Sequence, residues 1–196
     1  MWQANWIWGS EEGNNKYTLF RKEFQLPENI TQGTLRILAD SRYVLYLNGE
    51  RLGQGPARSW PHSQEYDLYN VGGKLKPGTN VLAVMVNHYG ISTFQYLSGP
   101  AGLLCQLDWE SDQKQDIVVT DPTWRVKKSR AFDSLTPRIS CQLPYSESYD
   151  ASKEEFGWTE VGFPDSHWEA AVLASDKDRK PQDLKQRSIE FLTEEP

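Results

Sequence analysis

Two short segments of the sequence combine aromatic rings with hydrogen-bonding side chains. One is residues 58–62 (RSWPH) and the other is residues 87–96 (NHYGISTFQY). A sugar ring offers an apolar face to Trp or Tyr and hydroxyl groups to amide, guanidinium and carboxylate groups, so this mixture is typical of carbohydrate recognition. We therefore interpret both segments as loops of a saccharide-binding site. Their candidate ligand-contacting residues are Arg58, Trp60, His62, Asn87, His88, Tyr89 and Gln95.

Trp60 and Tyr89 have a second interpretation, because large aromatic side chains are usually mostly buried in folded proteins. Each ring could pack on the edge of a rigid scaffold and have no ligand. The binding interpretation fails if segments 58–62 and 87–96 are both sealed inside the fold with no cleft between them.

Glu147 and Asp150 are the best local pair of carboxylates for glycoside hydrolysis. That reaction needs two carboxyl groups set roughly 5–10 Å apart across the bound sugar. Aromatic neighbours in residues 145–151 (YSESYDA) could partly desolvate them. An exposed loop whose acids cap turns is the favoured alternative, since most Asp and Glu side chains are solvated. We assign no catalytic residue to this chain and keep Glu147 and Asp150 as candidate saccharide ligands.

Nucleophilic and metal chemistry find little support among the remaining residues. The three histidines lie far apart in sequence, and none belongs to an HExxH pattern or accompanies a CxxC pair. Residues 53–55 (GQG) lack the third glycine and the Lys-Ser/Thr of a phosphate loop, so we interpret them as a turn. Cys105 is interpreted as a buried strand thiol, and a disulfide to Cys141, the only other cysteine, is left open.

Length and composition restrict the class of protein. The chain has 196 residues, a formal net charge of −6 and 38% hydrophobic residues. No run approaches the ~18 apolar residues of a membrane-spanning helix, which argues against a membrane protein. The acidic balance argues against nucleic acid as a partner, because phosphate binding relies on surplus Lys and Arg. No signal peptide is visible, so we expect a cytoplasmic protein, or a secreted one whose leader has been trimmed.

The elements that must position the two loops are strands. Residues 33–40 alternate apolar and polar side chains with the period of a half-buried strand. Asn48-Gly49 is a strong hairpin signal because both residue types accept positive φ, and a return strand through Arg51 and Leu52 should follow. The pattern predicts an all-β fold, an antiparallel β-sandwich of jelly-roll type. Expected strands are residues 16–26, 33–40, 43–47, 81–88, 101–109, 117–120 and 124–128, and Trp6, Trp8, Trp109 and Trp124 are expected in the core.

The composition changes near the end of the chain. We assign residues 1–175 to the sandwich domain. Residues 176–196 are mostly charged or polar and hold few large apolar side chains, too few for a core of their own. We expect them to form a linker, or a strand whose partner lies in an absent downstream domain.

Several stretches, in this order, resemble the N-terminal, non-catalytic region of bacterial α-L-rhamnosidases, the multidomain enzymes of glycoside hydrolase family 78. The YLNG and LKPGTN stretches also recur in galactose-binding-like sandwiches, so the combined order carries the resemblance. The matching stretches are FRKEF (20–24), LRILADSRY (35–43), YLNG (46–49), GPAR (55–58), LKPGTNVLAV (75–84), TDPTW (120–124), YDA (149–151), GFPDSHW (162–168) and RSIEFLTEE (187–195).

The resemblance implies a galactose-binding-like sandwich attached to an (α/α)₆ catalytic barrel whose general acid and base lie far downstream. The implied partners are a rhamnose-containing glycan and that catalytic domain. Some related sandwiches bind terminal rhamnose through calcium, so no cofactor is required and calcium is left open. The sequence shows no clustered acidic loop that would supply its six to eight oxygen ligands. The alternative is a purely structural domain that packs on the barrel, which predicts an exposed apolar patch.

Overall fold

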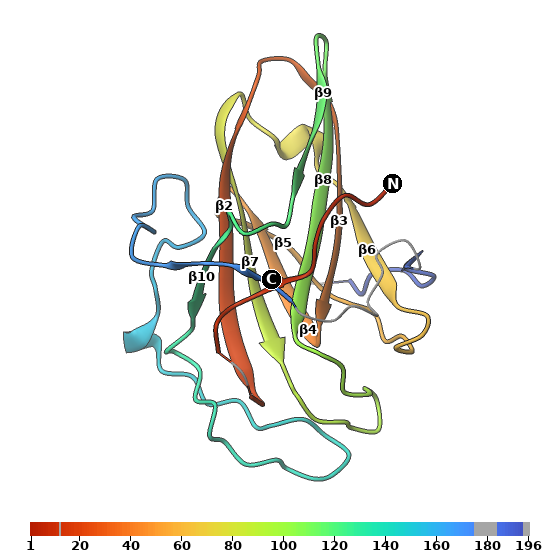
Figure 1. The fold of residues 1–196 in the computed structure, drawn as a ribbon, viewed down its shortest axis with the longest axis vertical. Coiled ribbons are helices and arrows are strands. Elements are labelled where there is room, and N and C mark those ends of the chain that lie inside the picture. The colour runs from red at the N-terminus through yellow and green to blue at the C-terminus, as the bar shows by residue number, and fades with distance from the viewer. Residues whose placement is uncertain (12, 175–183, 194–196) are drawn as a thin grey trace.

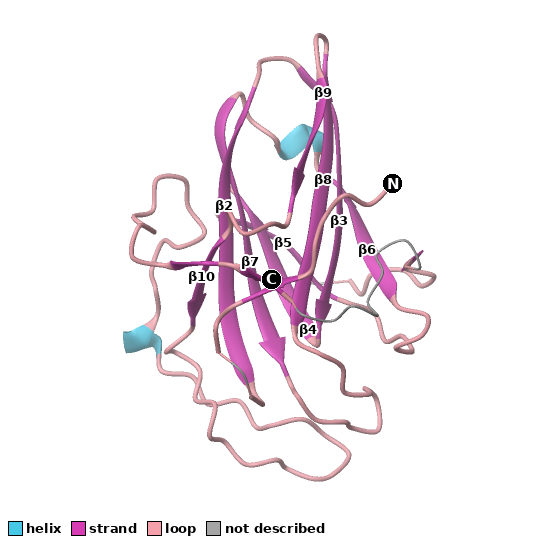
Figure 2. Cartoon of the chain, viewed as in Figure 1, coloured by secondary structure: helices cyan, strands magenta, loops and turns pink. Residues whose placement is uncertain are grey.

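The chain folds into two stacked β-sheets. The computed structural model describes residues 1–11, 13–174 and 184–193. Figure 1 shows long strands running lengthwise through the molecule, and Figure 2 shows that strands and loops make up almost all of it. The strands pair antiparallel except for one short parallel pair at a sheet edge. The prediction of an all-β antiparallel sandwich is confirmed. Among the described residues, no helix is long and apolar enough to cross a membrane.

The chain crosses repeatedly from one sheet to the other. The first sheet contains, in order, β12 (Val172–Leu173), β1 (Ile7–Trp8), β8 (Gly102–Ser111), β3 (Ile30–Asp40), β6 (Glu65–Asn70) and β13 (Lys185–Gln186), with β9 (Gln115–Val119) also paired to β8. The second sheet contains β11 (Glu169–Ala170), β10 (Arg125–Lys128), β2 (Lys16–Leu26), β7 (Gly78–His88), β4 (Arg42–Leu47) and β5 (Glu50–Gly55). Two single 3₁₀ turns, η1 (Gly72–Lys74) and η2 (Ala151–Lys153), complete the described elements.

The main core lies between the sheets and is built from one face of each strand. On β7, Leu82, Val84 and Val86 enter this core, whereas Ala83 packs on the outer side beneath Trp158 and Trp168. A strand buried on both faces explains why residues 81–88 read as nearly continuous apolar sequence. The prediction that four tryptophans are buried is confirmed: Trp8, Trp109 and Trp124 lie in this core, and Trp6 lies in a separate buried cluster.

The predicted hairpin joins β4 to β5. Asn48 and Gly49 both have positive φ, at 52° and 84°, and Leu47 pairs with Glu50 on either side of them. Glycine is favoured at the second position, because a φ of 84° is a backbone conformation that residues with a Cβ rarely adopt. The turn sets the pairing next to it, and a β-bulge shifts the register of the β4–β5 pair between Leu45 and Tyr46.

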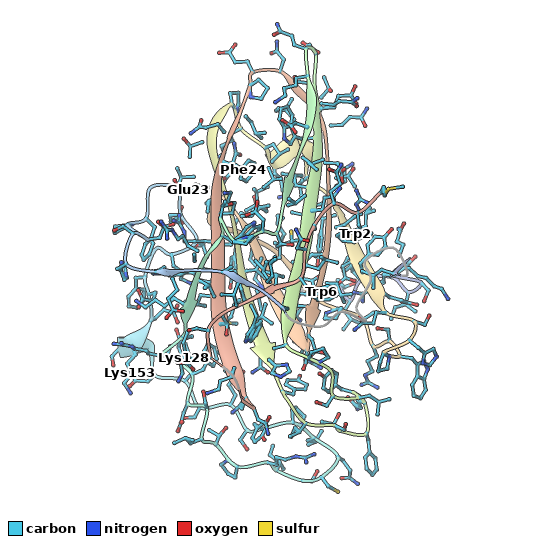
Figure 3. All side chains as sticks on the ribbon, viewed as in Figure 1. Trp2, Trp6, Glu23, Phe24, Lys128 and Lys153 are labelled. Carbon is cyan, nitrogen blue, oxygen red and sulfur yellow. The ribbon has the colours of Figure 1, made fainter. Side chains whose placement is uncertain are left out.

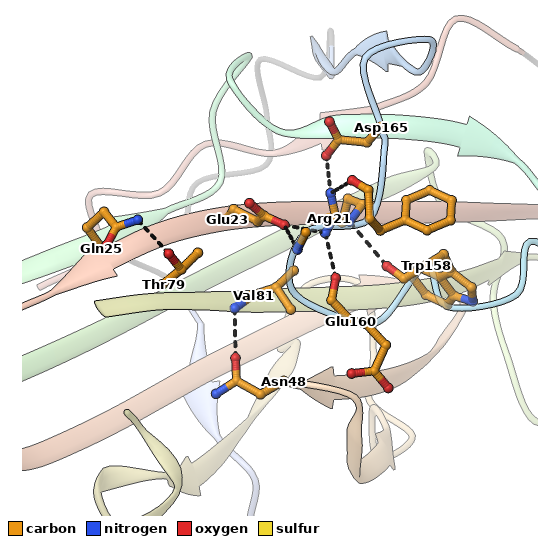
Figure 4. Close-up of polar contacts among 11 residues, drawn as sticks. Arg21, Glu23, Gln25, Asn48, Thr79, Val81, Trp158, Glu160 and Asp165 are labelled. Carbon is orange, nitrogen blue, oxygen red and sulfur yellow. Dashed lines mark hydrogen bonds and ion pairs between the residues drawn. The ribbon is translucent and has the colours of Figure 1, made fainter. Parts of the chain in front are cut away.

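The outer face of the second sheet is covered by residues 155–168, which one buried arginine fastens to the sheet. Arg21 of β2 is 0% exposed. Its guanidinium donates to the backbone oxygens of Trp158, Glu160 and Phe163, at 3.1, 2.9 and 3.3 Å. It also forms ion pairs with two carboxylates, those of Glu23 and Asp165 (Figure 4). Lys127 of β10 adds a second charged contact to this segment, an ion pair with Glu155.

The outer face of the first sheet is covered by the N-terminal segment. Trp2 and Trp6 lie along this segment where it crosses the sheet (Figure 3). Trp6 packs with Leu38 and Leu104, and the half-buried Leu184 from the C-terminal part joins the same cluster. Both ends of the chain thus contribute to one small hydrophobic cluster outside the main core.

Residues 184–193 lie against β6 of this same chain. β13 pairs with β6 in parallel, and Arg187 Nη1 lies 3.0 Å from Asp67 Oδ1. Residues 176–183, the first part of the expected linker, lie outside the described residues. Cys105 and Cys141 do not form a disulfide. Both thiols are free, and Cys105 is buried whereas Cys141 is exposed.

Candidate functional site

Four connections meet at one end of the sandwich, the lower end in Figure 1. They are the turn from β3 to β4, the loop after β5, the loop after β7 and the long loop after β10. The two segments singled out by sequence, 58–62 and 87–96, both belong to this end. Two neighbouring clefts open there, and they share Arg42, Pro56, Tyr89 and Pro144 as lining residues.

The smaller cleft has a volume of about 250 Å³ and brings the two predicted segments together. Arg58 lines it from the loop after β5, whereas Tyr89 and Gln95 line it from the loop after β7. Arg42, which can donate hydrogen bonds, and the aromatic ring of Tyr96 also line this cleft. Three of the predicted ligand-contacting residues therefore share one cavity.

The larger cleft has a volume of about 720 Å³ and receives two further predicted residues. Asn87, at the end of β7, and Glu147, in the loop after β10, line this cleft together with Tyr89. Phe191 and Arg187, from the C-terminal part of the chain, form another part of its wall. The described C-terminal residues thus contribute to the site region, which the sequence did not indicate.

Trp60 and His62 stand beside the smaller cleft. The Trp60 side chain is 63% exposed, and its ring stacks on His62 with a centroid distance of 6.2 Å. Trp60 does not line the cavity, but its neighbours Ser59 and Pro61 do, so the indole lies at the rim. An exposed indole with one free face is the arrangement that a stacking platform requires.

Two predicted residues lie away from both cavities. His88 is buried beneath the loop, with its ring edge-on to Trp8. Asp150 is exposed and begins η2, where its carboxylate accepts from Ser152 N and pairs with Lys153 at 2.9 Å. Hydrogen bonds from Ser152 and Lys153 lower the pKa of Asp150 to about 2. The local structure gives Asp150 a capping role, which was the alternative raised by the sequence.

A buried carboxylate shapes the smaller cleft, and sequence reasoning missed it. Asp40, 4% exposed, lies 2.9 Å through Oδ1 from His88 Nδ1 and accepts a hydrogen bond from the Tyr96 hydroxyl. Burial, with the nearby charge of Asp40, raises the pKa of Tyr96, so the phenol stays protonated as a donor. Ser41 Oγ in turn accepts from the backbone N–H of Tyr89. The Asp40-Ser41 pair thereby fastens the loop after β7 to the start of β4.

In the sequence, this network is indicated by Asp40 at the end of the predicted strand 33–40 and by Ser41 directly after it. A carboxylate at a strand end next to a serine is common in turns, so its burial could not be inferred from local sequence. The partners His88 and Tyr96 are 48 and 56 residues away, and the fold alone brings them to Asp40.

A second buried carboxylate supports the larger cleft. Asp67 is 0% exposed, accepts from the Tyr43 hydroxyl and pairs with Arg187. Burial raises the pKa of Asp67, while the hydrogen bonds from Tyr43 and Arg187 act in the opposite direction. The Tyr43 and Tyr69 hydroxyl oxygens are 3.1 Å apart. This cluster joins β4, β6 and the C-terminal part of the chain.

Gly53 and Gly55 leave room for the side chains of Tyr69 and Asp67. We expected a turn at residues 53–55, but the structure places them in β5. A Cβ on Gly53 would lie 2.8 Å from the Tyr69 hydroxyl oxygen, and one on Gly55 would lie 2.0 Å from Asp67 Oδ2. Glycine inside a strand often marks such a close approach, and here that role overrides its preference for turns.

We expect the stability of the domain to fall as pH rises from 10 towards 12. Burial raises the pKa of Tyr69 to about 12 from its ordinary value of 10. The unfolded chain loses this proton at a lower pH than the folded protein does. The stabilisation is therefore complete below pH 10, and it is lost as pH rises through about 12, the pKa of Tyr69 in the folded state. For a half-buried ring we expect about 1–2 kcal/mol.

Urea unfolding at a series of pH values measures this effect. Tyr69→Phe should flatten the decline relative to the wild type, whereas Tyr66→Phe on the same strand should leave it unchanged, because no described residue bonds to the Tyr66 hydroxyl. An identical decline in the wild type and in Tyr69→Phe would show that Tyr69 is not responsible.

The described residues contain no group of three or more His, Cys, Asp or Glu side chains that could hold a metal ion. The expectation that no cofactor is required, with calcium left open, stays a prediction, since calcium ligands also include carbonyl oxygens.

Comparison with known proteins adds independent information. The family described as the α-L-rhamnosidase N-terminal domain matches residues 28–192. An α-L-rhamnosidase of Streptomyces avermitilis is 34% identical over 171 residues, covering 81% of this chain and 16% of that protein. The crystal structure of a GH78 family rhamnosidase of Bacillus sp. GL1 is 40% identical, with a TM-score of 0.87, and covers 99% of this chain and 20% of that one.

A lectin shares the fold at a greater distance. The structure of a Pleurotus ostreatus lectin in complex with GalNAc is 26% identical, with a TM-score of 0.53, over 87% of this chain and 41% of the lectin. The chain spans about a sixth to a fifth of the length of the two rhamnosidases described in the preceding paragraph.

Proposed function

Because this chain belongs to the family of α-L-rhamnosidase N-terminal domains, we propose that its loop end binds a rhamnose-containing glycan and presents it to a catalytic barrel that follows in the same protein. Membership of this family is observed, and glycan binding by this chain is what we propose. The smaller cleft is the observation that carries this step. It unites Arg58 of one predicted loop with Tyr89 and Gln95 of the other, although these segments are separated by two strands.

The polar groups of this cleft are available to a ligand. The side-chain amides of Gln64 and Gln95 form no hydrogen bond with any described residue, and both residues line the cavity. Sugar hydroxyls both donate and accept, so amide groups suit them. Trp60 at the rim offers an apolar surface for the face of a sugar ring. The shared fold with a GalNAc-binding lectin supports the same conclusion.

Cleavage of the glycan belongs, in this proposal, to the downstream barrel. Glu147 and Asp150 do not share a cavity: Glu147 lines the larger cleft, and Asp150 caps η2. Glycoside hydrolysis needs both carboxyl groups beside the same bond. We therefore propose that these residues do not act as an acid and base pair.

Calorimetric titration of the 196-residue chain with L-rhamnose and rhamnosyl disaccharides, with and without calcium, tests binding. We expect millimolar affinity, which Trp60→Ala lowers about tenfold, by analogy with the roughly 1–3 kcal/mol that a nucleic-acid base gains by stacking on an aromatic side chain. Leu173→Ala is the matched control, because Leu173 is exposed but lies in β12, outside both clefts. Absence of heat at millimolar sugar would refute the binding claim.

A second candidate function is docking on the catalytic barrel without a ligand. Five large apolar side chains in the loops at the same end are 40–91% exposed, and they support this alternative. They are Phe94, Leu97, Leu135, Ile139 and Leu143. Docking predicts that Trp60→Ala and Tyr89→Ala lower the stability of the intact enzyme but leave its sugar affinity unchanged, the opposite of the binding proposal.

A further inference from the structure

The smaller cleft carries more positive charge than a neutral sugar would require. Two arginines, Arg42 and Arg58, and one carboxylate, Asp40, line it. The Asp40 carboxylate is engaged by His88 and Tyr96 in the buried network described above. The cleft is therefore positive overall, in a chain whose formal charge is −6.

Both guanidinium groups can still take an anionic partner. Arg58 is exposed and forms no hydrogen bond or ion pair with any residue that the structure describes. Arg42 is also exposed, and it contacts the Tyr89 hydroxyl, whose pKa is raised by burial and partly lowered again by Arg42. No described carboxylate pairs with Arg42. Arg36 and Arg187, by comparison, each form an ion pair with a carboxylate.

We propose that the smaller cleft takes a uronic acid unit of the glycan, with its carboxylate paired to Arg42 and Arg58. This inference rests on the proposed function and names the class of sugar that the site selects. The planar guanidinium matches a carboxylate with two parallel hydrogen bonds, and such charge-assisted bonds are about twice as strong as neutral ones. The amides of Gln64 and Gln95 would serve the ring hydroxyls, and the Tyr96 ring and Pro61 supply apolar wall.

The volume favours a single ring. A cavity of about 250 Å³ is smaller than the roughly 300–1,000 Å³ of pockets that hold drug-sized molecules. The rest of the glycan, including its rhamnose, would extend from the cleft over the exposed Trp60 or into the adjoining larger cleft, which shares the Arg42 wall. The site would thus recognise a uronate next to rhamnose in an acidic polysaccharide or oligosaccharide.

Titrations of the ¹⁵N-labelled chain, followed by NMR, test this with pairs of sugars that differ in the carboxylate. The pairs are galacturonic acid with galactose and glucuronic acid with glucose. Rhamnose, acetate and galactose 6-sulfate are the further probes. We expect each uronic acid to bind about tenfold more tightly than its neutral partner, as one charged hydrogen-bonded contact predicts. That advantage should shrink between about 0.05 M and about 0.5 M NaCl, because exposed charges are screened.

Variants identify the residues responsible. Arg58→Gln should remove much of the roughly tenfold preference for galacturonic acid over galactose and weaken its dependence on salt, because only Arg42 would still pair with the carboxylate. Arg130→Gln, an exposed arginine outside both clefts, is the matched control and should leave the affinity unchanged. The ¹⁵N spectrum of each variant reports whether the fold is retained.

The outcomes separate this inference from the proposed function. If rhamnose and the neutral sugars bind as tightly as the uronic acids, uronate selection is wrong and glycan binding stands. Equal affinity for acetate would reduce the site to an anion site, and tighter binding of galactose 6-sulfate would replace the carboxylate by a sulfate ester. If no sugar shifts any resonance, both proposals fail.

Discussion

Replacing Arg21 by methionine should cost about 3–5 kcal/mol of unfolding free energy, the usual effect of breaking a buried ion pair from one side. Three backbone carbonyl groups would lose their donor, and Asp165 would lose its partner (Figure 4). Methionine fills a similar volume, so the loss would report the polar contacts more than a cavity. Guanidinium-induced unfolding, followed by tryptophan fluorescence, measures the change.

Lys74→Met is the control for Arg21→Met. Lys74 pairs with Glu50, but the two side chains are 44% and 59% exposed, and an exposed pair contributes little. We expect a change within about 0.5 kcal/mol. Arg21→Lys should fall between the two, because an ammonium group cannot reach the same set of acceptors as a planar fork. A loss below about 1 kcal/mol for Arg21→Met would show that residues 155–168 are held mainly by Trp158 and Trp168 packing.

Asp40→Ala should have the second largest effect, and it should change binding as well as stability. His88 and the Tyr96 hydroxyl would lose a buried acceptor, and an unsatisfied buried group costs about 1–3 kcal/mol. We expect a total loss of about 2–4 kcal/mol. Because Asp40 and Ser41 fasten the loop that carries Tyr89 and Gln95, rhamnose affinity should fall at least about tenfold.

Two variants make the Asp40 result interpretable. Asp40→Asn keeps the shape and one acceptor oxygen, so it should retain most of the stability and separate the role of the charge from that of the hydrogen bonds. Asp112→Ala, an exposed residue next to β8, should change stability by no more than about 0.5 kcal/mol. Normal sugar affinity in a folded Asp40→Ala protein would mean that the network does not position the cleft.

Much of the fold follows from local sequence. Alternation of apolar and polar side chains located β3, and Asn48-Gly49 located the β4–β5 hairpin, because a positive φ at both residues is a local requirement. Continuous apolar sequence indicated that β7 is covered on both faces. GQG at 53–55 lacks the signature of a phosphate loop and is predicted to be a turn, whereas the close approach of Tyr69 and Asp67 requires glycine at 53 and 55 within β5.

The candidate site was predictable only in part. Aromatic and polar composition indicated the loops, and the structure gathers Arg58, Tyr89 and Gln95 around one cavity. The residues that hold this cavity were not found, because a pairing such as Asp40 with His88 spans 48 residues and has no local pattern. The wall formed by Arg187 and Phe191 could not be predicted either. The composition of this polar segment indicates a linker, and its pairing with the edge strand β6 has no local pattern in the sequence.

The most direct test of glycan binding at the loop end is a map of ¹⁵N amide shifts during titration of the chain with L-rhamnose and with a rhamnosyl uronic acid disaccharide. The largest shifts should occur at Ser41, Tyr89 and Gln95, on the wall of the smaller cleft, and should saturate in the millimolar range. Shifts confined to η1 and the β8–β9 turn, or a spectrum that both sugars leave unchanged, would contradict the account.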